Sequence, residues 1–529
     1  MLSYFAVAPI LIAILLYLVP FEKAARIIAI VTQTALFGFA FYVFMLCKEG
    51  DIVARVGNFE WFMGIIIRID TLSSVFLMLT SFIFLVATIY SFNGGFSRLF
   101  WFLLFVWQGL LNSIFISNDI FNIFVLVEVV TVVVAVLIMY NRDNRSMYDG
   151  MVYLMIDIVA MQFYLFGAGY VYKLTGTLDM TAAAQVMAGL DKSSLLLPFA
   201  LIMTALSLKC ALTPLFSWLP KAHGTPSAPA AVSAVLSGMH IKCGIYLFIR
   251  FQSVFAEISM SEFFLIVGVI TGITGAVFAL SQTDVKLILS YSTISQVGMI
   301  MIGLNVADVY SYTGSVYHIF NHALFKSALF MCAGAIVHMY GTRDINQIRG
   351  VLRRYPLVGV ATIMAILGII GTPFFNGSIS KYFITPEANW AVRGPIILIN
   401  LGTIIVFMKF STMLFGRAEG FHEHEKMDGF KQTAILALGI LCLAGGVFGE
   451  QFIEFLFNIE VNVDAAGYLE KTGLFVLSVI AGYFIFRYFV DKHPFFKKIR
   501  GFDMSFRWMC ASIGGFFAVI LIVTRLFAV

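Results

Sequence analysis

Residues 121–140 read FNIFVLVEVVTVVVAVLIMY, an apolar run that is long enough to cross a lipid bilayer. One carboxylate, that of Glu128, stands in its middle. A carboxylate near a bilayer centre costs roughly 2.5–3.5 kcal/mol on insertion scales, so such a residue normally has a partner and a function. Four lysines occupy similarly apolar runs elsewhere in the chain: Lys209, Lys242, Lys326 and Lys381. A buried acid and several buried amines on separate helices indicate a path for protons or cations.

The whole chain has the composition of an integral membrane protein. Of its 529 residues, 60% are hydrophobic and 12% are charged, and the mean hydropathy is +0.94. About sixteen apolar runs of spanning length follow one another along the chain. They leave no room for a soluble domain. We therefore predict an all-α polytopic membrane protein that forms one integral membrane unit.

Lysine and arginine are distributed unevenly between alternate loops. The side that includes the first loop holds 19 of these residues, and the opposite side holds 9. The positive-inside rule places the richer side in the cytoplasm. We expect a multi-pass protein of the cell membrane (the inner or cytoplasmic membrane) with both termini outside.

The sequence lacks the motifs of several other functional classes. Its six cysteines are scattered through apolar segments without any C-x-x-C pair, so neither an iron–sulfur cluster nor a zinc site is indicated. No phosphate-binding loop or dinucleotide fingerprint is present. We expect no cofactor, no bound metal, no nucleic-acid partner and no catalytic redox site within this chain.

Two predicted helices are interrupted by proline and polar residues. Residues 207–220 read SLKCALTPLFSWLP, and residues 368–381 read GIIGTPFFNGSISK. Pro214 and Pro373 each remove a backbone donor and clash with the preceding turn, so each helix should break nearby. Carbonyl groups freed at membrane depth are tolerated only where they are buried in protein or line a wet cavity.

Broken segments in two halves of a chain are typical of transporters built from inverted repeats. We place the halves at residues 99–251 and 261–415, as two half-channels. N-terminal helices then occupy residues 1–98, and C-terminal helices occupy residues 430–529. The alternative is a pair of ordinary proline kinks, which does not explain why each break carries a lysine.

Glu128 and Lys209 are predicted to form a switchable ion pair. A buried lysine whose partner withdraws is desolvated and can release its proton. Because breaking a buried pair is costly, the motion must be driven from outside this chain. The structural alternatives are a carboxylate that bonds a neighbouring helix and a lysine that extends to the interface. Asp157 is a further buried carboxylate without an evident partner, and its role stays open.

His318, His322 and Lys326 recur at every fourth position, which stacks them on one helix face about 6 Å apart. Histidine titrates near neutrality and passes protons in either direction. The two histidines also suggest a metal, but no third ligand of suitable spacing is evident. Lys242 lies among small residues and is predicted to act as a relay, whereas His240 is expected to serve packing or backbone bonding.

Two further residues are candidates for the ends of the path. Lys381, at the second break, is the natural exit. His338 lies near the end of its helix, where it either links the path to solvent or caps the helix.

Four stretches together resemble the antiporter-like subunits shared by respiratory complex I, membrane-bound hydrogenases and Mrp-type multi-subunit Na⁺/H⁺ antiporters. The resemblance covers about residues 60–415. The stretches are 117–128, 218–223 with Pro226 and 233–238, 284–296, and 318–326. It implies about fourteen core helices with two inverted five-helix repeats that contain broken helices. About two extra C-terminal helices would follow.

The resemblance also implies roles for individual residues. Glu128 is similar to the family's fifth-helix glutamate, Lys209 to its seventh-helix lysine and Lys242 to its eighth-helix lysine. The central histidines would be His318 and His322, and the terminal twelfth-helix residue Lys381.

The chain departs from the family's pattern at two places. Lys221 replaces the usual acid of the Trp-Leu-Pro-Asp-Ala-His motif, so we expect the contacts of that loop to differ from those of the family. The connection 491–506 is short and contains Pro494 and Gly501, so we expect no long lateral helix there. These features favour a middle-type or Mrp-D-like subunit.

The sequence predicts an ion-translocating subunit of a redox-driven respiratory or hydrogenase-type complex. The transported ion would be the proton, or Na⁺ in exchange for protons. Its partners would be the bilayer and other membrane subunits, including sister antiporter-like subunits. A second hypothesis is a Mrp-type cation/proton antiporter without a redox partner. A third is a non-conducting membrane scaffold for a peripheral enzyme.

Overall fold

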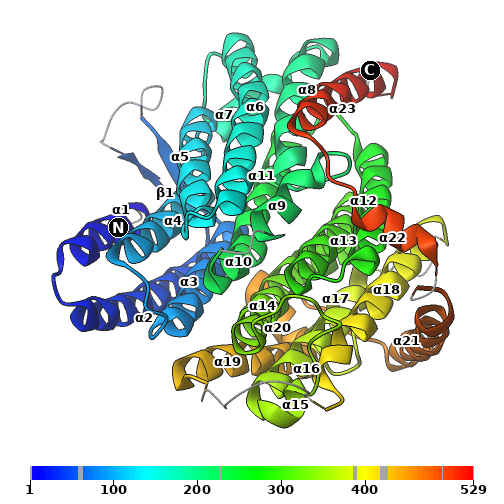
Figure 1. Cartoon of the computed structure of the whole chain (residues 1–529). Coiled ribbons are helices and arrows are strands. Elements are labelled where there is room, and N and C mark those ends of the chain that lie inside the picture. The colour runs from blue at the N-terminus through cyan, green and yellow to red at the C-terminus, as the bar shows by residue number, and fades with distance from the viewer. Residues whose placement is uncertain are drawn as a thin grey trace.

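The computed structural model describes residues 3–56, 64–224, 228–384, 390–417, 427–490 and 493–527. Pro226, which contributes to the resemblance, lies outside these residues. The described chain is a bundle of helices with one small hairpin near the N-terminus (Figure 1).

The elements follow one another in this order. The N-terminal elements are α1 (Tyr4–Leu18), α2 (Glu22–Cys47), β1 (Ile52–Arg55), β2 (Ile66–Ile69) and α3 (Thr71–Ser91). The first half contains α4 (Arg98–Ile116), α5 (Ile120–Ile138), α6 (Asn144–Thr175), α7 (Met180–Met187), α8 (Lys192–Lys209), η2 (Leu215–Ser217), α9 (Trp218–Gly224), α10 (Ala230–Val235), η3 (Leu236–His240) and α11 (Ile241–Val254). The second half contains α12 (Ser261–Ser281), α13 (Val285–Asn305), α14 (Val309–Tyr340), α15 (Val351–Arg354), α16 (Pro356–Ile370), α17 (Asn376–Ile384), α18 (Trp390–Ser411) and η4 (Thr412–Leu414). The C-terminal elements are α19 (Gly429–Val447), α20 (Gly449–Phe457), α21 (Ala465–Ile485), η5 (Phe486–Val490), α22 (Pro494–Arg500) and α23 (Phe506–Phe527).

The predicted membrane architecture is confirmed. Among the described residues, 14 helical spans are long and apolar enough to cross a membrane, and two shorter apolar helices, α1 and α16, accompany them. Each of the sixteen predicted segments corresponds to one of these helices. The antiparallel hairpin β1–β2 was not predicted, because its two short strands lie between apolar runs and carry no strong pattern.

The two halves share the same local structure at a constant offset of 165 residues. Asp119 and Asp284 cap the starts of α5 and α13, and the 32-residue helices α6 and α14 both end at a left-handed glycine. An isolated bridge joins Asp119 to Asp179, and an equivalent bridge joins Asp284 to Asp344. Five spans separate the starts of α5 and α13, so the two units enter the membrane from opposite sides. The boundaries 99–251 and 261–415 remain predictions.

Both predicted helix breaks are present. α8 ends at Lys209 and α9 begins at Trp218, with a cis peptide bond before Pro214 in the connection. α16 ends at Ile370 and is followed by Gly371, which has a φ of +80°, and α17 begins at Asn376. Each break leaves carbonyl groups of the last helical turn without a helical donor.

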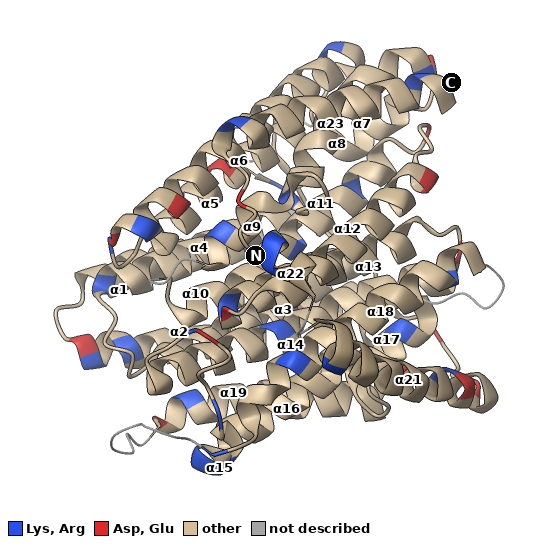
Figure 2. Ribbon diagram, turned by 45° about the vertical axis from the view of Figure 1, so that its right-hand side comes forward, with Lys and Arg blue, Asp and Glu red and all other residues tan. Residues whose placement is uncertain are grey.

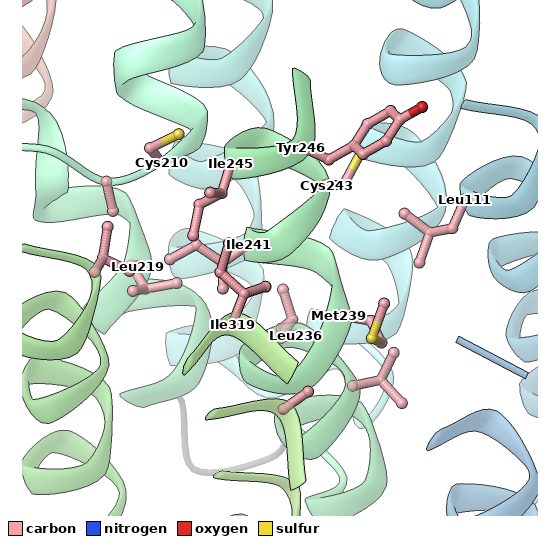
Figure 3. Close-up of a cluster of buried hydrophobic side chains, with 14 of the residues drawn as sticks. Leu111, Cys210, Leu219, Leu236, Met239, Ile241, Cys243, Ile245, Tyr246 and Ile319 are labelled. Carbon is pink, nitrogen blue, oxygen red and sulfur yellow. The ribbon is translucent and has the colours of Figure 1, made fainter. Parts of the chain in front are cut away.

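A third irregularity was not predicted. η3 is a π-helical turn that joins α10 to α11, and every residue of it is buried. Apolar side chains from neighbouring helices surround it, among them Leu219 and Ile319 (Figure 3). The turn contains no proline.

The helix that continues from this turn is anchored outside the membrane core. Arg250, near the end of α11, donates from Nη2 to Asp70 Oδ1 at 2.5 Å, and Asp70 caps the start of α3. Burial would raise the pKa of Asp70, but the hydrogen bond and charge of Arg250 outweigh it, so that the pKa falls to about 2. The ion pair therefore holds α11 against α3 at physiological pH.

The C-terminal helices tie the two halves together. α21 packs against α18 in the second half, whereas α23 packs against α8 and α6 in the first. The short α22 packs against α12 and lies between α21 and α23 (Figure 1). Within the described part of the 491–506 connection, this seven-residue helix is the only one, as the prediction of no long lateral helix requires.

The helices α12 and α13 approach each other closely through glycines. A Cβ atom at Gly298 would lie 2.2 Å from the backbone nitrogen of Gly272. Small residues at membrane interfaces allow such contact between backbones.

Replacing Gly298 by alanine should therefore force α12 and α13 apart and destabilise the protein by about 1–3 kcal/mol, the usual cost of overpacking. The measurement is the thermal unfolding midpoint of the purified protein in detergent. Gly38→Ala on α2 is the matched control, because nothing lies within 4 Å of its Cβ position. Equal midpoints for the two variants would contradict the predicted contact.

Candidate functional site

The predicted stripe of titratable residues lies on one helix, α14, and is buried. His318, His322 and Lys326 are each 0% exposed, and the ring centroids of the two histidines are 6.3 Å apart. This distance matches the spacing expected for successive helical turns. The three side chains meet partners from different neighbouring helices, which brings residues distant in sequence to one place.

His318 is held between two polar side chains. Its Nε2 lies 3.1 Å from Gln296 Oε1, and its Nδ1 lies 2.8 Å from Ser380 Oγ. Because an amide oxygen only accepts, Nε2 carries the proton, and Nδ1 of the neutral ring accepts from the serine hydroxyl. Gln296 donates through Nε2 to Thr403 at 3.0 Å, which agrees with this orientation of its amide.

Lys242 contacts the second histidine directly. Its Nζ lies 2.5 Å from His322 Nδ1 and also donates to the carbonyl oxygen of Ser237, in the π-helical turn η3. The other ring nitrogen of His322 is buried and has no hydrogen-bond partner among the described residues. A proton can therefore pass between the lysine and the imidazole without movement of either helix.

Lys326 and Lys381 are each supplied with acceptors. Lys326 Nζ donates to the carbonyl oxygen of Leu289 at 2.9 Å and to Ser292 Oγ. Lys381 Nζ donates to the carbonyl oxygen of Ile369 at 2.6 Å and to Asn400 Oδ1 at 2.7 Å. Ile369 belongs to the last turn of α16, so the predicted break provides an acceptor for the lysine that follows it.

In this structure Lys209 pairs with Asp157 rather than with Glu128, so the switchable pair of Lys209 with Glu128 remains a prediction. Lys209 Nζ lies 2.9 Å from Asp157 Oδ1 and donates to Thr131 Oγ1 at 2.9 Å. Glu128 Oε1 is buried without a hydrogen-bond partner in the described structure. Lys209 and Asp157 are the charged groups that act on Glu128. Asp157, for which the sequence indicated no partner, thus occupies the place predicted for Glu128.

His240 bonds a side chain rather than the backbone. Its Nε2 lies 3.0 Å from the hydroxyl oxygen of Tyr153, one helical turn before Asp157 on α6. His240 also stands two residues before Lys242. Tyr153 and His240 therefore lie between the Lys209 pair and Lys242, a connection that sequence analysis missed.

Other residues lie apart from the buried line. His338 is exposed near the end of α14, and its predicted link to the buried groups remains a prediction. Lys409, on α18, is buried and donates to the carbonyls of Leu280 and Gln282 at the end of α12. Lys221 and Lys286, counted with the loop residues, are also buried.

His223 is a further buried residue that the sequence analysis did not select. It is 0% exposed, its ring stacks on Phe330 at 4.6 Å, and neither ring nitrogen has a hydrogen-bond partner among the described residues. Phe330 follows Lys326 by one turn of α14. The signal available in the sequence was the place of His223 at the end of the stretch 218–223, which carries part of the family resemblance.

Basic side chains occur inside the helix bundle as well as at its ends. Basic residues lie on helices inside the bundle, around α14, as well as at helix ends (Figure 2). No group of three or more His, Cys, Asp or Glu side chains that could hold a metal ion is found in the described part of the chain. The arrangement is a line of amines, imidazoles and hydroxyls suited to proton transfer.

A family model for the transmembrane part of NADH:quinone oxidoreductases and Mrp antiporters matches residues 117–427. The chain belongs to this family. The matched region overlaps the stretch 60–415 over which the resemblance was recognised.

Known proteins of this family are similar over nearly the whole chain. This chain is 27% identical to a Na⁺/H⁺ antiporter subunit of Alkalihalophilus pseudofirmus over 488 residues, which cover 88% of this chain and 98% of that relative. The fold is similar to that of a chain in the Mrp complex from Dietzia sp., with a TM-score of 0.79 and 21% identity, covering 94% of this chain and 99% of that one. It is equally similar to a chain of the membrane-bound sulfane sulfur reductase, an archaeal respiratory membrane complex, with a TM-score of 0.80, 21% identity and coverage of 90% and 99%.

The chain is therefore an antiporter-like, ion-translocating membrane subunit of the kind found in multi-subunit Mrp or complex I-like respiratory complexes. This confirms the family, the fold class and the expected assembly into a larger complex.

The buried pair of Lys209 and Asp157 should contribute to the free energy of unfolding. Asp157→Asn should destabilise the protein by about 3 kcal/mol, because the lysine ammonium is left buried without its counter-charge. Replacing both residues with apolar ones, Asp157→Leu with Lys209→Met, should recover most of this loss. A double-mutant cycle of thermal unfolding midpoints measures the coupling, and strictly additive losses would contradict a direct interaction.

Proposed function

We propose that this chain moves protons across the membrane as a subunit of a redox-driven complex. The path that we propose begins at the Glu128, Asp157 and Lys209 cluster. It continues through Lys242 to His322 and His318, and it leaves by Lys381. The contact of 2.5 Å between Lys242 Nζ and His322 Nδ1 is the observation that carries the proposal, because it joins the two halves of the chain.

The chemistry follows from the protonation states that each contact permits. A proton on Lys242 passes to His322 Nδ1, since the lysine N–H bond breaks as the imidazole N–H bond forms. His318 exchanges protons with the serine hydroxyl of Ser380, which precedes Lys381 in α17. Lys326 is held by two acceptors beside the path, where its charge opposes a second proton on His322.

The driving force enters at the first cluster. While Lys209 pairs with Asp157, its proton is held by the opposite charge. Movement of Lys209 toward Glu128, whose carboxylate oxygen Oε1 lacks a partner among the described residues, opens that pair. Opening a buried pair costs several kcal/mol, so a partner subunit must supply the energy.

A second candidate function is cation/proton exchange in a Mrp-type antiporter without a redox partner. It is favoured by the similarity to a Na⁺/H⁺ antiporter subunit, since this chain covers 98% of that relative's length. We further propose that both termini lie outside the cytoplasm, from the distribution of lysine and arginine. The halves 99–251 and 261–415 would then open to opposite sides.

Lys242→Ala should reduce proton translocation by about tenfold or more, because it removes the amine that joins the two halves. The measurement uses the complete complex, isolated through a tag on this chain and placed in closed vesicles with a dye that reports ΔpH. Translocation is driven first by the electron donor of any co-purifying redox subunit and then by a Na⁺ gradient alone.

Lys409→Met is the matched control, since it removes another buried lysine, which lies on α18 and bonds carbonyl groups at the end of α12. It should leave translocation near the wild-type rate once assembly is confirmed. A complex that still pumps fully with Lys242→Ala would exclude the proposed path and favour a scaffold. Exchange driven by Na⁺ in the absence of any redox subunit would favour the second candidate.

A further inference from the structure

A polar pocket lies at the face predicted to be cytoplasmic, between the start of α6 and the connection from α8 to α9. Its lining combines charged and polar groups with residues of the C-terminal connection, among them Arg145, Asp149, Lys221, Gln282, Arg500 and Asp503. Three basic and two acidic side chains thus surround it. The pocket lies where residues of the first half meet Gln282, Leu287 and Tyr291 of the second half and the C-terminal connection.

The segment between α22 and α23 forms one wall of this pocket. Lys221 Nζ, on α9, lies 2.5 Å from Asp503 Oδ1. Arg500 donates from Nε to the carbonyl oxygen of Ser281 at 2.7 Å, and the ring of Phe502 packs against Phe278 at 5.6 Å. Lys221, which departs from the family motif, therefore holds the C-terminal segment in place.

One carboxylate of the pocket is buried and incompletely bonded. The side chain of Asp149 is 1% exposed, and its Oδ2 accepts from Arg145 Nε at 2.8 Å. Its Oδ1 is buried and has no hydrogen-bond partner among the described residues. Because a buried, unsatisfied carboxylate oxygen is costly, this atom requires an explanation beyond the ion pair with Arg145.

Asp149 stands in line with the first cluster. Asp149, Tyr153 and Asp157 occupy positions i, i+4 and i+8 of α6, which places them on one face at steps of about 6 Å. All three are buried. The stripe leads from the pocket to the carboxylate that pairs with Lys209.

The internal repeat relates this stripe of α6 to the stripe of titratable residues on α14. At the offset of 165 residues, Tyr153 corresponds to His318 and Asp157 to His322. Thr131, which bonds Lys209, corresponds to Gln296, which bonds His318. The face of α6 that carries Asp149 is thus the equivalent of the face of α14 that carries the proposed path.

We propose that protons enter the first half through Asp149, from the pocket under the C-terminal segment. In this step hydronium in the pocket gives up a proton, and an O–H bond forms at Asp149 Oδ1. The proton then moves along the α6 stripe past Tyr153 to Asp157, and its arrival there neutralises the carboxylate and releases Lys209. The inference rests on the proposed function and adds the entrance that its path lacks.

The test uses the complete complex in closed vesicles. Asp149→Asn keeps the shape of the side chain and its bond to Arg145 but removes the titrating group, and it should lower proton translocation about tenfold or more. Asp149→Glu should restore most of the rate. Asp191→Asn, an exposed acid at the start of α8, is the matched control and should leave the rate unchanged.

Asp149→Ala with added formate separates proton transfer from a structural role. The truncated side chain leaves space beside Arg145, Lys221 and Arg500, and formate should restore translocation if a carboxylate is needed there to carry protons. Full activity of Asp149→Asn, or an Asp149→Ala complex that formate leaves inactive, would overturn the proposal. If Lys242→Ala is inactive while Asp149→Asn is fully active, only the proposal that protons enter through Asp149 is contradicted. If both variants are fully active, the proposed function is contradicted as well.

Discussion

The interior of this protein depends on one constraint: an ammonium group removed from water must be given acceptors by the protein. Each buried lysine on the proposed path meets this requirement with at least two partners. The partners of Lys242 and Lys381 include backbone carbonyls from places where a helix is irregular, the π-helical turn η3 and the end of α16. In a regular helix these carbonyls would bond to the helix itself. The breaks are therefore the means by which an apolar bundle solvates its amines.

The same constraint explains which features could be predicted from the sequence. Proline and glycine mark the breaks after Lys209 and before Lys381, and a spacing of four residues marks the stripe on α14. Both are local signals. The ion pair of Lys209 with Asp157 joins α8 to α6, and no local pattern distinguishes Asp157 from Glu128 as the partner. The π-helical turn carries no proline, so its acceptor for Lys242 could not be foreseen either.

The internal repeat also shows how one scaffold can carry two chemistries. At equivalent positions the first half has Tyr153 and Asp157, whereas the second has His318 and His322. A carboxylate holds a lysine by opposite charge, and an imidazole accepts its proton directly. In the proposed path, the first half thus holds a lysine in a charged pair until a proton reaches it, whereas the second half accepts the proton of a lysine directly.

If the first half holds its lysine in that pair until a proton arrives, the pair must be protected from the solvent that supplies protons. The C-terminal connection is placed to do this, because α21 rests on the second half, α23 rests on the first, and the segment between them closes the pocket beside Asp149. The ion pair of Lys221 with Asp503 joins this segment to α9, which directly follows the break after Lys209. A shift of the broken helix that moves Lys209 would therefore act on the same connection that covers the pocket. The departure at Lys221 from the family motif and the C-terminal helices α21 and α23 are, in this view, parts of one device that links access to the pocket with the opening of the Lys209–Asp157 pair.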